Sequence, residues 1–346
     1  MPILDKNNPR DVEKYINFVR GSRHKSITQD LNWSKVKWDW GNEQVYVEKN
    51  GEIVAAMSLL VKQVPLAGAL LYAPRGPVCE VNDIALVKEL INEAEPLTKK
   101  YKAFALKMDP EVLYSEELQR EYQENGFTVR NIGVKKDALI QPRYNMILKF
   151  DDHDKESIMS KFSGKTRNRV RAAAKKGVYT VHGSSDDLLE KFYKIYLEMT
   201  HRNKLTARSY EYFLKMRESF EGLRIYIARH EEDDLSAGLT INYYGKMYYL
   251  YAGSTDIKRN LGPNQLMNYD MISWGIDEGA VQYDFGGVLA LDKSDGLYEF
   301  KIGFCDKDGV SEYIGEIDKV YNPFVYYIFN NVLPKLQRLR IMLTRK

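Results

Sequence analysis

Cysteine and histidine are scarce in this sequence, and neither is clustered. The two cysteines, Cys79 and Cys305, lie far apart, and no Cys-x-x-Cys pair occurs. The five histidines show none of the spacings typical of metal ligands. We therefore expect neither a disulfide framework nor a metal site, and a reducing compartment fits the composition best.

Long apolar segments are also missing. Residues 1–6 lack the apolar core of a signal peptide. The longest apolar run near the C-terminus, residues 324–329, is too short to cross a bilayer. These features predict a cytoplasmic protein.

An excess of one charge sign is absent as well. The 346 residues include 51 Lys and Arg against 48 Asp and Glu, a net charge of +3. This balance argues against a general nucleic-acid coat protein and leaves room for a local basic patch. The length suffices for two average domains. Tyrosine is abundant, with 25 residues, which suits grooves that stack on a polar ligand and form hydrogen bonds with it.

The chain contains an internal repeat of predicted strands. Three short strand patterns in the first half recur in the second half at offsets of 180, 182 and 179 residues: 45–47 with 225–227, 53–59 with 235–241, and 72–74 with 251–253. Each copy continues into a predicted helix and then an apolar strand, at 82–100 and 104–108 in the first copy and at 263–279 and 281–285 in the second. Chance alignment of short strands is the alternative. Duplication of one α/β unit, with helices packed on a mixed sheet, explains the order better.

Residues 259–264, Arg-Asn-Leu-Gly-Pro-Asn, precede the predicted helix of the second copy. In GNAT-type N-acyltransferases, which use acyl-CoA, a loop of the pattern Arg/Gln-x-x-Gly-x-Gly/Ala binds the pyrophosphate at this place. Here Pro263 removes one N–H donor and Asn264 replaces the last glycine, which weakens the case for coenzyme A. An ordinary helix start with Pro263 at its first position is the alternative.

A basic segment over residues 161–176 carries seven cations and no acid. Helical spacing places Arg167 and Arg171 on one face, with Lys165 and Arg169 on a neighbouring face. A solvated surface is one interpretation. The other is a polyanionic partner bound through its phosphates, which would supply the charge that the segment lacks.

The sequence has no Gly-x-Ser-x-Gly elbow and no Walker loop, and it offers no clear nucleophile. Acyl transfer from an activated ester to an amine needs none. It requires juxtaposed substrates, a route for the amine's proton and a cation or donor at the developing oxyanion.

Several motifs, in this order and spacing, resemble the FemABX family of non-ribosomal peptidyltransferases from residue 1 to about residue 322. The motifs that carry the resemblance are residues 28–37 (TQDLNWSKVK), 72–78 (YAPRGPV), 109–112 (DPEV), 141–145 (QPRYN), 251–254 (YAGS), 283–287 (YDFGG) and 313–318 (YIGEID). The sequence also lacks the sustained heptads of the coiled-coil arm that some members of this family carry.

The resemblance implies an α/β fold of two tandem GNAT-like domains that flank a cleft, without a coiled-coil arm. Domain 1, on the muropeptide side, is expected over residues 1–145 and completed by residues 318–346. Domain 2, on the tRNA side, is expected over residues 146–317. No cofactor is implied, and we expect a monomer.

The resemblance also implies the substrates. One is UDP-MurNAc-pentapeptide with lysine at its third position, and the other is an aminoacyl-tRNA whose amino acid passes to the lysine ε-amine. Alanine is the expected amino acid, with serine or glycine, and a lipid-linked acceptor, as alternatives. An acetyl-CoA-dependent N-acyltransferase and an RNA-binding module without catalysis are the rival functions.

Site residues follow from matching motif positions. Lys37, Arg208 and Tyr212 resemble contacts to the UDP-muropeptide, with the two cations at its diphosphate. Tyr251 and Asp109 are expected in the cleft, where Asp109 would orient the ammonium or accept its proton; a carboxylate of ordinary pKa is a poor base, so proton transfer assisted by the tRNA itself is an equal alternative. Phe300 and Lys301 resemble the pair that faces the tRNA end and the reacting ester, with Lys301 at the oxyanion or at a phosphate of the CCA end. Phe104 stands where the family has a tyrosine, so a hydroxyl contact to the muropeptide is absent or supplied by another group. Lys165, Arg167, Arg169 and Arg171 are the candidates for tRNA binding.

Beyond residue 334 the chain combines Lys and Arg with Leu, Ile and Met in the pattern of a basic amphipathic helix. Such a helix can lie on an anionic membrane, which would suit a lipid-linked acceptor. Packing of the helix against domain 1 is the alternative.

Overall fold

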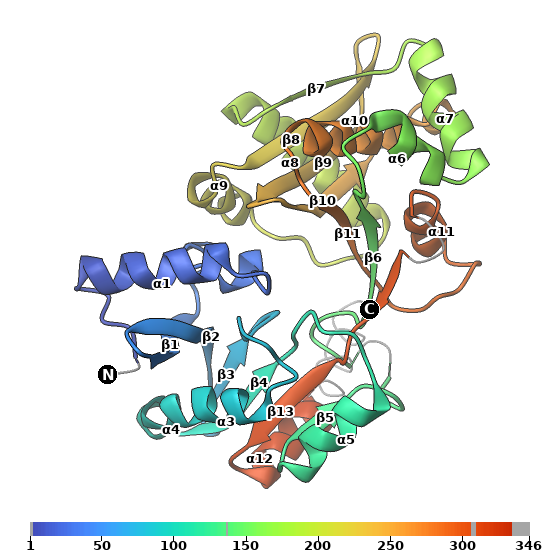
Figure 1. Ribbon diagram of the computed structural model, residues 1–346. Coiled ribbons are helices and arrows are strands. Elements are labelled where there is room, and N and C mark those ends of the chain that lie inside the picture. The colour runs from blue at the N-terminus through green and yellow to red at the C-terminus, as the bar shows by residue number, and fades with distance from the viewer. Residues whose placement is uncertain (1–2, 136–137, 306–308, 334–346) are drawn as a thin grey trace. The chain divides into compact units, whose positions relative to one another are not determined.

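The computed structural model describes residues 3–135, 138–305 and 309–333. The chain forms two compact units: unit 1 comprises Met1–Arg143 and Glu312–Lys346, and unit 2 comprises Tyr144–Ser311. Each is built on one mixed sheet (Figure 1). No helix within the described ranges combines the length and apolar character needed to cross a membrane. The basic helix predicted over 334–346 lies outside the described residues.

Unit 1 has a six-stranded sheet in the order β1-β2-β3-β4-β13-β5, in which only β3 and β4 pair in parallel. Its elements in chain order are α1 (Pro9–Gly21), η1 (Ile27–Gln29), α2 (Trp33–Val36), β1 (Gly41–Lys49), β2 (Glu52–Val64), β3 (Gly68–Ala73), α3 (Ile84–Glu93), α4 (Glu95–Tyr101), β4 (Ala103–Met108), α5 (Glu116–Glu124), β5 (Thr128–Arg130), β13 (Glu316–Val320), α12 (Pro323–Tyr327) and the π-helical turn η3 (Ile328–Val332).

Local sequence signals explain several of these boundaries. The Asn8 side chain accepts a hydrogen bond from the Arg10 N–H and so caps α1. Asn50 and Gly51, with φ of 54° and 82°, make the tight turn between β1 and β2. The helical pattern over 82–100, whose second half contains Pro96, forms two helices that meet at Ala94, because Pro96 lies in the first turn of the second one.

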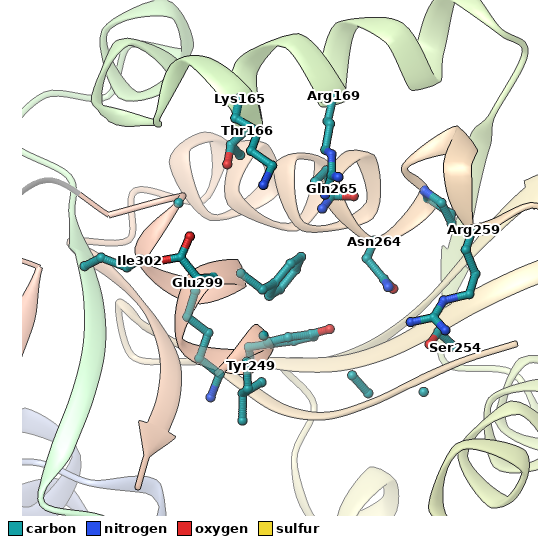
Figure 2. Close-up of a pocket in the computed structure, with 18 of the residues that line it drawn as sticks. Lys165, Thr166, Arg169, Tyr249, Ser254, Arg259, Asn264, Gln265, Glu299 and Ile302 are labelled. Carbon is teal, nitrogen blue, oxygen red and sulfur yellow. The ribbon is translucent and has the colours of Figure 1, made fainter. Parts of the chain in front are cut away.

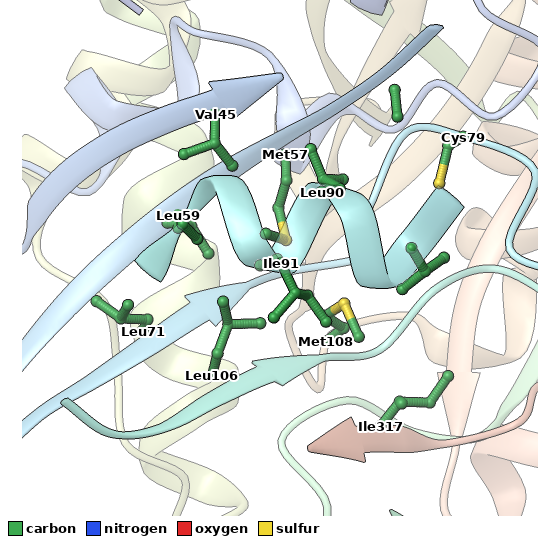
Figure 3. Packing of buried hydrophobic residues seen from close by; sticks show 14 of the residues in the cluster. Val45, Met57, Leu59, Leu71, Cys79, Leu90, Ile91, Leu106, Met108 and Ile317 are labelled. Atoms are coloured by element: carbon green, nitrogen blue, oxygen red, sulfur yellow. The ribbon is translucent and has the colours of Figure 1, made fainter. Parts of the chain in front are cut away.

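The core of unit 1 lies between α3 and the sheet (Figure 3). Leu90 and Ile91 of α3 pack with Met57 of β2 and Leu106 of β4, and each of the four is at most 5% exposed. Burying one such side chain contributes about 1.5–3 kcal/mol. This packing fixes the sheet, and with it the residues that follow β3 and β4.

Unit 2 has a seven-stranded sheet in the order β12-β6-β11-β10-β9-β8-β7, in which β10 and β11 pair in parallel. Its elements in chain order are β6 (Tyr144–Lys149), α6 (Lys155–Lys161), α7 (Gly164–Lys175), β7 (Tyr179–Gly183), α8 (Asp186–Arg202), α9 (Tyr210–Ser219), β8 (Leu223–His230), β9 (Asp233–Tyr243), β10 (Lys246–Ser254), η2 (Arg259–Leu261), α10 (Pro263–Asp277), β11 (Gln282–Val288), α11 (Gly296–Ile302) and β12 (Val310–Glu312).

The predicted repeat is visible in the two sheets. Strands β1-β2-β3-β4 and β8-β9-β10-β11 lie in the same order, and each series ends in a parallel pair joined through helix. The strand beyond each pair is antiparallel in both cases: β13, from the C-terminal part of the chain, beside β4, and β6 beside β11. Each unit therefore contains the same strand arrangement, completed from a different part of the chain.

The two parallel pairs differ in length. In unit 1 the pairing of β3 and β4 continues to Ala73 and Met108. In unit 2 the pairing of β10 and β11 stops at Tyr248 and Asp284, although β10 continues to Ser254. The sheet of unit 2 therefore opens where these two strands separate.

Candidate functional site

A cavity of about 1330 Å³ lies in unit 2 and is lined by the part of β10 beyond its last pair with β11. Its walls come from α7, β10, the start of α10, and α11. Figure 2 shows Lys165 and Arg169 of α7 on one side of it, with Tyr249 of β10 opposite and Asn264 of α10 and Arg259 of η2 toward one end. Cavities at the ends of parallel strands are common ligand sites.

Cations surround one part of this cavity. Lys165, Arg169 and Arg259 line it, together with the first residues of α10. Gly262 has φ of +80° and no side chain caps α10, so the helix N-terminus adds positive potential to that of the cations. Among the described residues neither Lys165 nor Arg169 forms an ion pair. This part of the cavity can accept phosphate.

The structure separates the four cations that we predicted on α7. Lys165 and Arg169 line the cavity, and Arg171 is exposed but does not line it. Arg167 donates to the carbonyl oxygens of Ser160, at 2.9 Å, and of Phe162. Arg167 is therefore a structural link between α6 and α7, and only two of the four cations face the cavity.

Phe300 and Lys301 of α11 also line the cavity. Lys301 is 8% exposed, and its Nζ donates to the carbonyl oxygen of Gly287 at 2.9 Å. Burial lowers the pKa of Lys301 to about 8, and the charge of Asp284 opposes this shift. The ammonium is therefore a cation that can change its protonation near neutral pH.

Arg208, Tyr212 and Tyr251 come together elsewhere in unit 2. The Tyr251 hydroxyl donates to the Tyr212 hydroxyl at 3.1 Å, and the Arg208 guanidinium lies 5.2 Å from the centre of the Tyr212 ring. Phe213 packs edge-on against both tyrosines. Burial raises the pKa of Tyr212 well above its usual value, which keeps the hydroxyl protonated. Arg208 itself is exposed and can meet an anion.

In unit 1, Asp109 directly follows β4 and is 2% exposed. Its carboxylate accepts hydrogen bonds from the Tyr72 hydroxyl and from the Arg75 backbone N–H, each at 2.6 Å. Burial raises the pKa of Asp109 to about 7, although Arg75 and Tyr72 both favour the charged form. This carboxylate is therefore a stronger base than a solvated one, as proton transfer near neutral pH requires.

The segment that holds Asp109 is itself held by buried polar groups. Gln29 donates through its side chain to the carbonyl oxygens of Pro74, at 2.9 Å, and of Ser58, at 3.2 Å. A Cβ at Gly76 would lie 2.4 Å from the Gln29 amide carbon, so this close contact requires glycine. Gln29, Pro74 and Gly76 belong to the motifs that carry the family resemblance, and this membership was the sequence signal that they have a role.

Two further predicted residues lie in unit 1. Lys37 follows α2, is partly buried, and places its Nζ 5.9 Å from the centre of the Trp40 ring. Phe104 is 1% exposed, and its ring packs 5.2 Å from that of Phe329. The structure places Phe104 in the core, because an apolar ring on this central strand is covered by the segment after β13. A direct ligand contact would require the ring to leave that packing.

The FemAB family model matches residues 11–230 and 223–333. This chain belongs to the FemAB family. It is 38% identical over 333 residues to the UDP-N-acetylmuramoylpentapeptide-lysine N(6)-alanyltransferase of Weissella viridescens, and the match covers 94% of this chain and 98% of that protein. In an alignment of 406 positions it is 26% identical to a lipid II:glycine glycyltransferase of Staphylococcus haemolyticus, and the alignment covers 95% of this chain and 96% of that protein.

Solved structures show the same fold. The crystal structure of FemX superposes with a TM-score of 0.83 at 22% identity, over 96% of this chain and all of that one. A tandem GNAT protein of clavulanic acid biosynthesis gives a TM-score of 0.57 at 10% identity, over 93% and 98% of the chains. The predictions of the family and of a mixed α/β fold with two GNAT-like units are confirmed, and the expected cleft stays a prediction.

Proposed function

We propose that this FemAB protein transfers L-alanine from an aminoacyl-tRNA to the lysine ε-amine of UDP-MurNAc-pentapeptide. The observation that carries the proposal is the 38% identity to the Weissella alanyltransferase along 94% of the chain. Because the match spans both units, it supports the whole reaction and not one binding function. The same match to an enzyme along nearly the whole chain argues against an RNA-binding role without catalysis.

The cavity of unit 2 supports the donor side of the proposal. Lys165, Arg169 and Arg259 would meet phosphates of the tRNA 3′ end, which position the RNA without reading its sequence. Phe300 and Lys301 line the same cavity and would face the ester that joins the amino acid to the terminal ribose. The cavity thus has both a phosphate-binding part and a reactive group.

The reaction needs no protein nucleophile. The neutral lysine amine attacks the ester carbonyl, a C–N bond forms, and the C–O bond to the ribose breaks, so that the ribose hydroxyl leaves with a proton. The Lys301 ammonium would stabilise the negative oxygen of the tetrahedral intermediate, a type of contact whose removal costs about 10²–10³ in rate.

Unit 1 supports the acceptor side. Asp109 would orient the substrate ammonium and take its proton, for which a pKa near 7 is well suited. In unit 1, Lys37 would also meet phosphate of the UDP group. In unit 2, Arg208 would meet phosphate, and Tyr212 and Tyr251 would contact the muropeptide. These assignments rest on position in the family motifs and on the polar chemistry of the side chains.

Two alternatives remain open to the same assay. The staphylococcal relatives, named as lipid II:glycine glycyltransferases, raise transfer of glycine to a lipid-linked acceptor. The GNAT-like fold raises acetyl transfer from acetyl-CoA. Against the latter, Pro263 occupies the first position of α10 and removes one of the N–H groups that would bind a pyrophosphate.

The test supplies the purified protein with radiolabelled alanyl-, seryl- or glycyl-tRNA, or with acetyl-CoA. Each donor is combined with UDP-MurNAc-pentapeptide or with its lipid-linked form, presented in vesicles. We expect label in the nucleotide-linked product only with aminoacyl-tRNA and fastest with alanine. Acetyl transfer, or RNA binding without any product, would overturn the proposal. Preference for the lipid-linked acceptor would support membrane contact and correct the substrate.

A further inference from the structure

Asp284 lies at the point where the sheet of unit 2 opens. It forms the last pair of the parallel β10–β11 ladder, opposite Tyr248. On its other side the pairing of β11 with β6 becomes irregular between Asp284 and Gly287. Gly286 has φ of +74°, a conformation that favours glycine, so β11 turns sharply directly after Asp284.

The Asp284 carboxylate holds this turn. One oxygen accepts the Gly286 backbone N–H at 2.6 Å, and both oxygens accept the side-chain amide of Asn145, at 3.3 and 3.1 Å. Asp284 and Asn145 are each 4% exposed. A carboxylate buried to this extent is costly unless it is hydrogen-bonded and faces a cation.

The negative charge of Asp284 acts on the Lys301 ammonium and raises its pKa. The Lys301 Nζ donates to the carbonyl oxygen of Gly287, and it lies 3.6 Å from where a Cβ at Gly286 would stand. The turn fixed by Asp284 therefore contacts the ammonium through the Gly287 carbonyl oxygen, and any side chain at Gly286 would come within van der Waals contact of the ammonium. Within the described part of the chain, the titratable groups whose charges act on Lys301 are Asp284 of β11, Asp295 at the start of α11, and Cys305. Other charged groups that line the same cavity are Lys161, Lys165, Arg169, Arg202, Arg259 and Glu299.

We propose that Asp284 is a positioning residue for Lys301: it fixes the Gly286–Gly287 turn that holds the ammonium and supplies the buried negative charge that faces it. The inference rests on the proposed function, in which Lys301 stabilises the intermediate. It adds a residue to which no role was assigned from the family motifs. Asp284 touches neither substrate in this proposal and acts through Lys301.

The test compares Asp284→Asn with the wild type, since asparagine keeps the size and can still accept the Gly286 N–H. We expect kcat for alanyl transfer to fall at least about tenfold at pH 7.5, with the KM for UDP-MurNAc-pentapeptide unchanged. The alkaline limb of the pH profile should move to lower pH, because loss of a facing anion makes Lys301 release its proton more readily. In the Lys301→Arg background the same substitution should leave that limb in place, because arginine stays charged.

Asp270→Asn is the matched control. Asp270 is a partly buried carboxylate of α10 that accepts the Thr180 hydroxyl at 2.7 Å and does not line the cavity. This variant should retain kcat and the pH profile. A wild-type kcat and alkaline limb in Asp284→Asn would overturn the inference, and so would a change equal to that of Asp270→Asn.

A second measurement is independent of turnover. Acetic anhydride labelling of Lys301, followed by peptide mass spectrometry over a pH series, reports its protonation directly. The midpoint should shift to lower pH in Asp284→Asn, and an unchanged midpoint would contradict the inference. If Lys301→Ala itself keeps wild-type activity, the proposed function of Lys301 fails. If Lys301→Ala is impaired and Asp284→Asn is not, only the positioning role fails.

Discussion

The two units share a strand order and differ at the ends of their parallel strands. In unit 1, β3 and β4 stay paired to Ala73 and Met108, and Tyr72 then bonds to Asp109. In unit 2, β10 and β11 part after Tyr248 and Asp284, and β10 beyond that point lines a cavity of about 1330 Å³. The same scaffold therefore presents a buried carboxylate in one copy and a cationic cavity in the other.

The difference shows how one fold can carry two tasks. The strand order follows from buried apolar faces, which both copies need. The residues at the strand ends differ between the copies: in unit 2 the pairing stops at Asp284, and Gly286 directly beyond it has φ of +74°. Function on such a fold depends on these ends and not on the sheet.

The largest effect is expected in unit 2, where β10 and β11 separate. Lys301→Ala should lower kcat for alanyl transfer by about 10²–10³, because a cation at the developing oxyanion is lost. The KM for UDP-MurNAc-pentapeptide should change little. Single-turnover transfer from labelled alanyl-tRNA measures this, and a rate within about threefold of the wild type would remove Lys301 from the mechanism.

Variants at the end of the β3–β4 pair in unit 1, where Asp109 lies, should give a somewhat smaller effect. Asp109→Asn removes the proposed proton acceptor and should lower kcat about 10²-fold. Tyr72→Phe keeps the carboxylate and removes a hydrogen bond that favours its charged form. The pKa of Asp109 should then rise further, so the acidic limb of the pH–rate profile should move to higher pH. An acidic limb unchanged in both variants would exclude Asp109 as the group that titrates.

A matched pair on α7 tests the cationic wall of the cavity in unit 2. Arg169 lines the cavity and Arg171, one half-turn later, does not. Arg169→Ala should raise the KM for alanyl-tRNA about tenfold. It should also reduce the slope of log affinity for the tRNA against log salt concentration by about one. Arg171→Ala should change both values less. Equal effects would mean that α7 binds RNA through its exposed face, outside the cavity.

The smallest effect concerns stability. The pKa of Asp109 is raised to about 7 in the folded protein, so the folded state binds this proton more tightly than the unfolded chain does. This stabilisation is complete below the unfolded pKa of about 4 and is lost as the pH rises through 7. Asparagine does not ionise. Thermal unfolding should therefore show the Tm of Asp109→Asn rising relative to that of the wild type between pH 5 and pH 8, and a constant difference would contradict the burial argument.

Much of the fold could be predicted because its signals are local. The helix start at Asn8 and Pro9 and the turn at Asn50 and Gly51 are set by neighbouring residues. The first residue of α10, Pro263, was also indicated by its fixed φ and missing N–H. Pro96 indicated that the pattern over 82–100 weakens in its second half, but not where the break falls, because a proline in a helical pattern can end one helix or begin the next.

The candidate site was predictable only as a list of residues. Family motifs identified Lys301 and Asp109. They gave no sign that the charge of Asp284 acts on Lys301, or that the Tyr72 hydroxyl donates to the Asp109 carboxylate. Periodicity placed four cations on α7 in two pairs and could not say that Arg167 turns back to α6. Such contacts depend on how a helix packs against other elements, and the sequence of the helix alone does not specify those partners.

The sequence alone determined the repeat of the α/β unit, the absence of coenzyme A's full binding loop, the basic segment and membership of the family, because each is written in the order of neighbouring residues. The tertiary structure decided where the second sheet opens, which cations line the cavity, and why Asp109 and Lys301 both titrate near neutral pH. Those properties come from burial and from groups distant in the chain, and only folding brings them together.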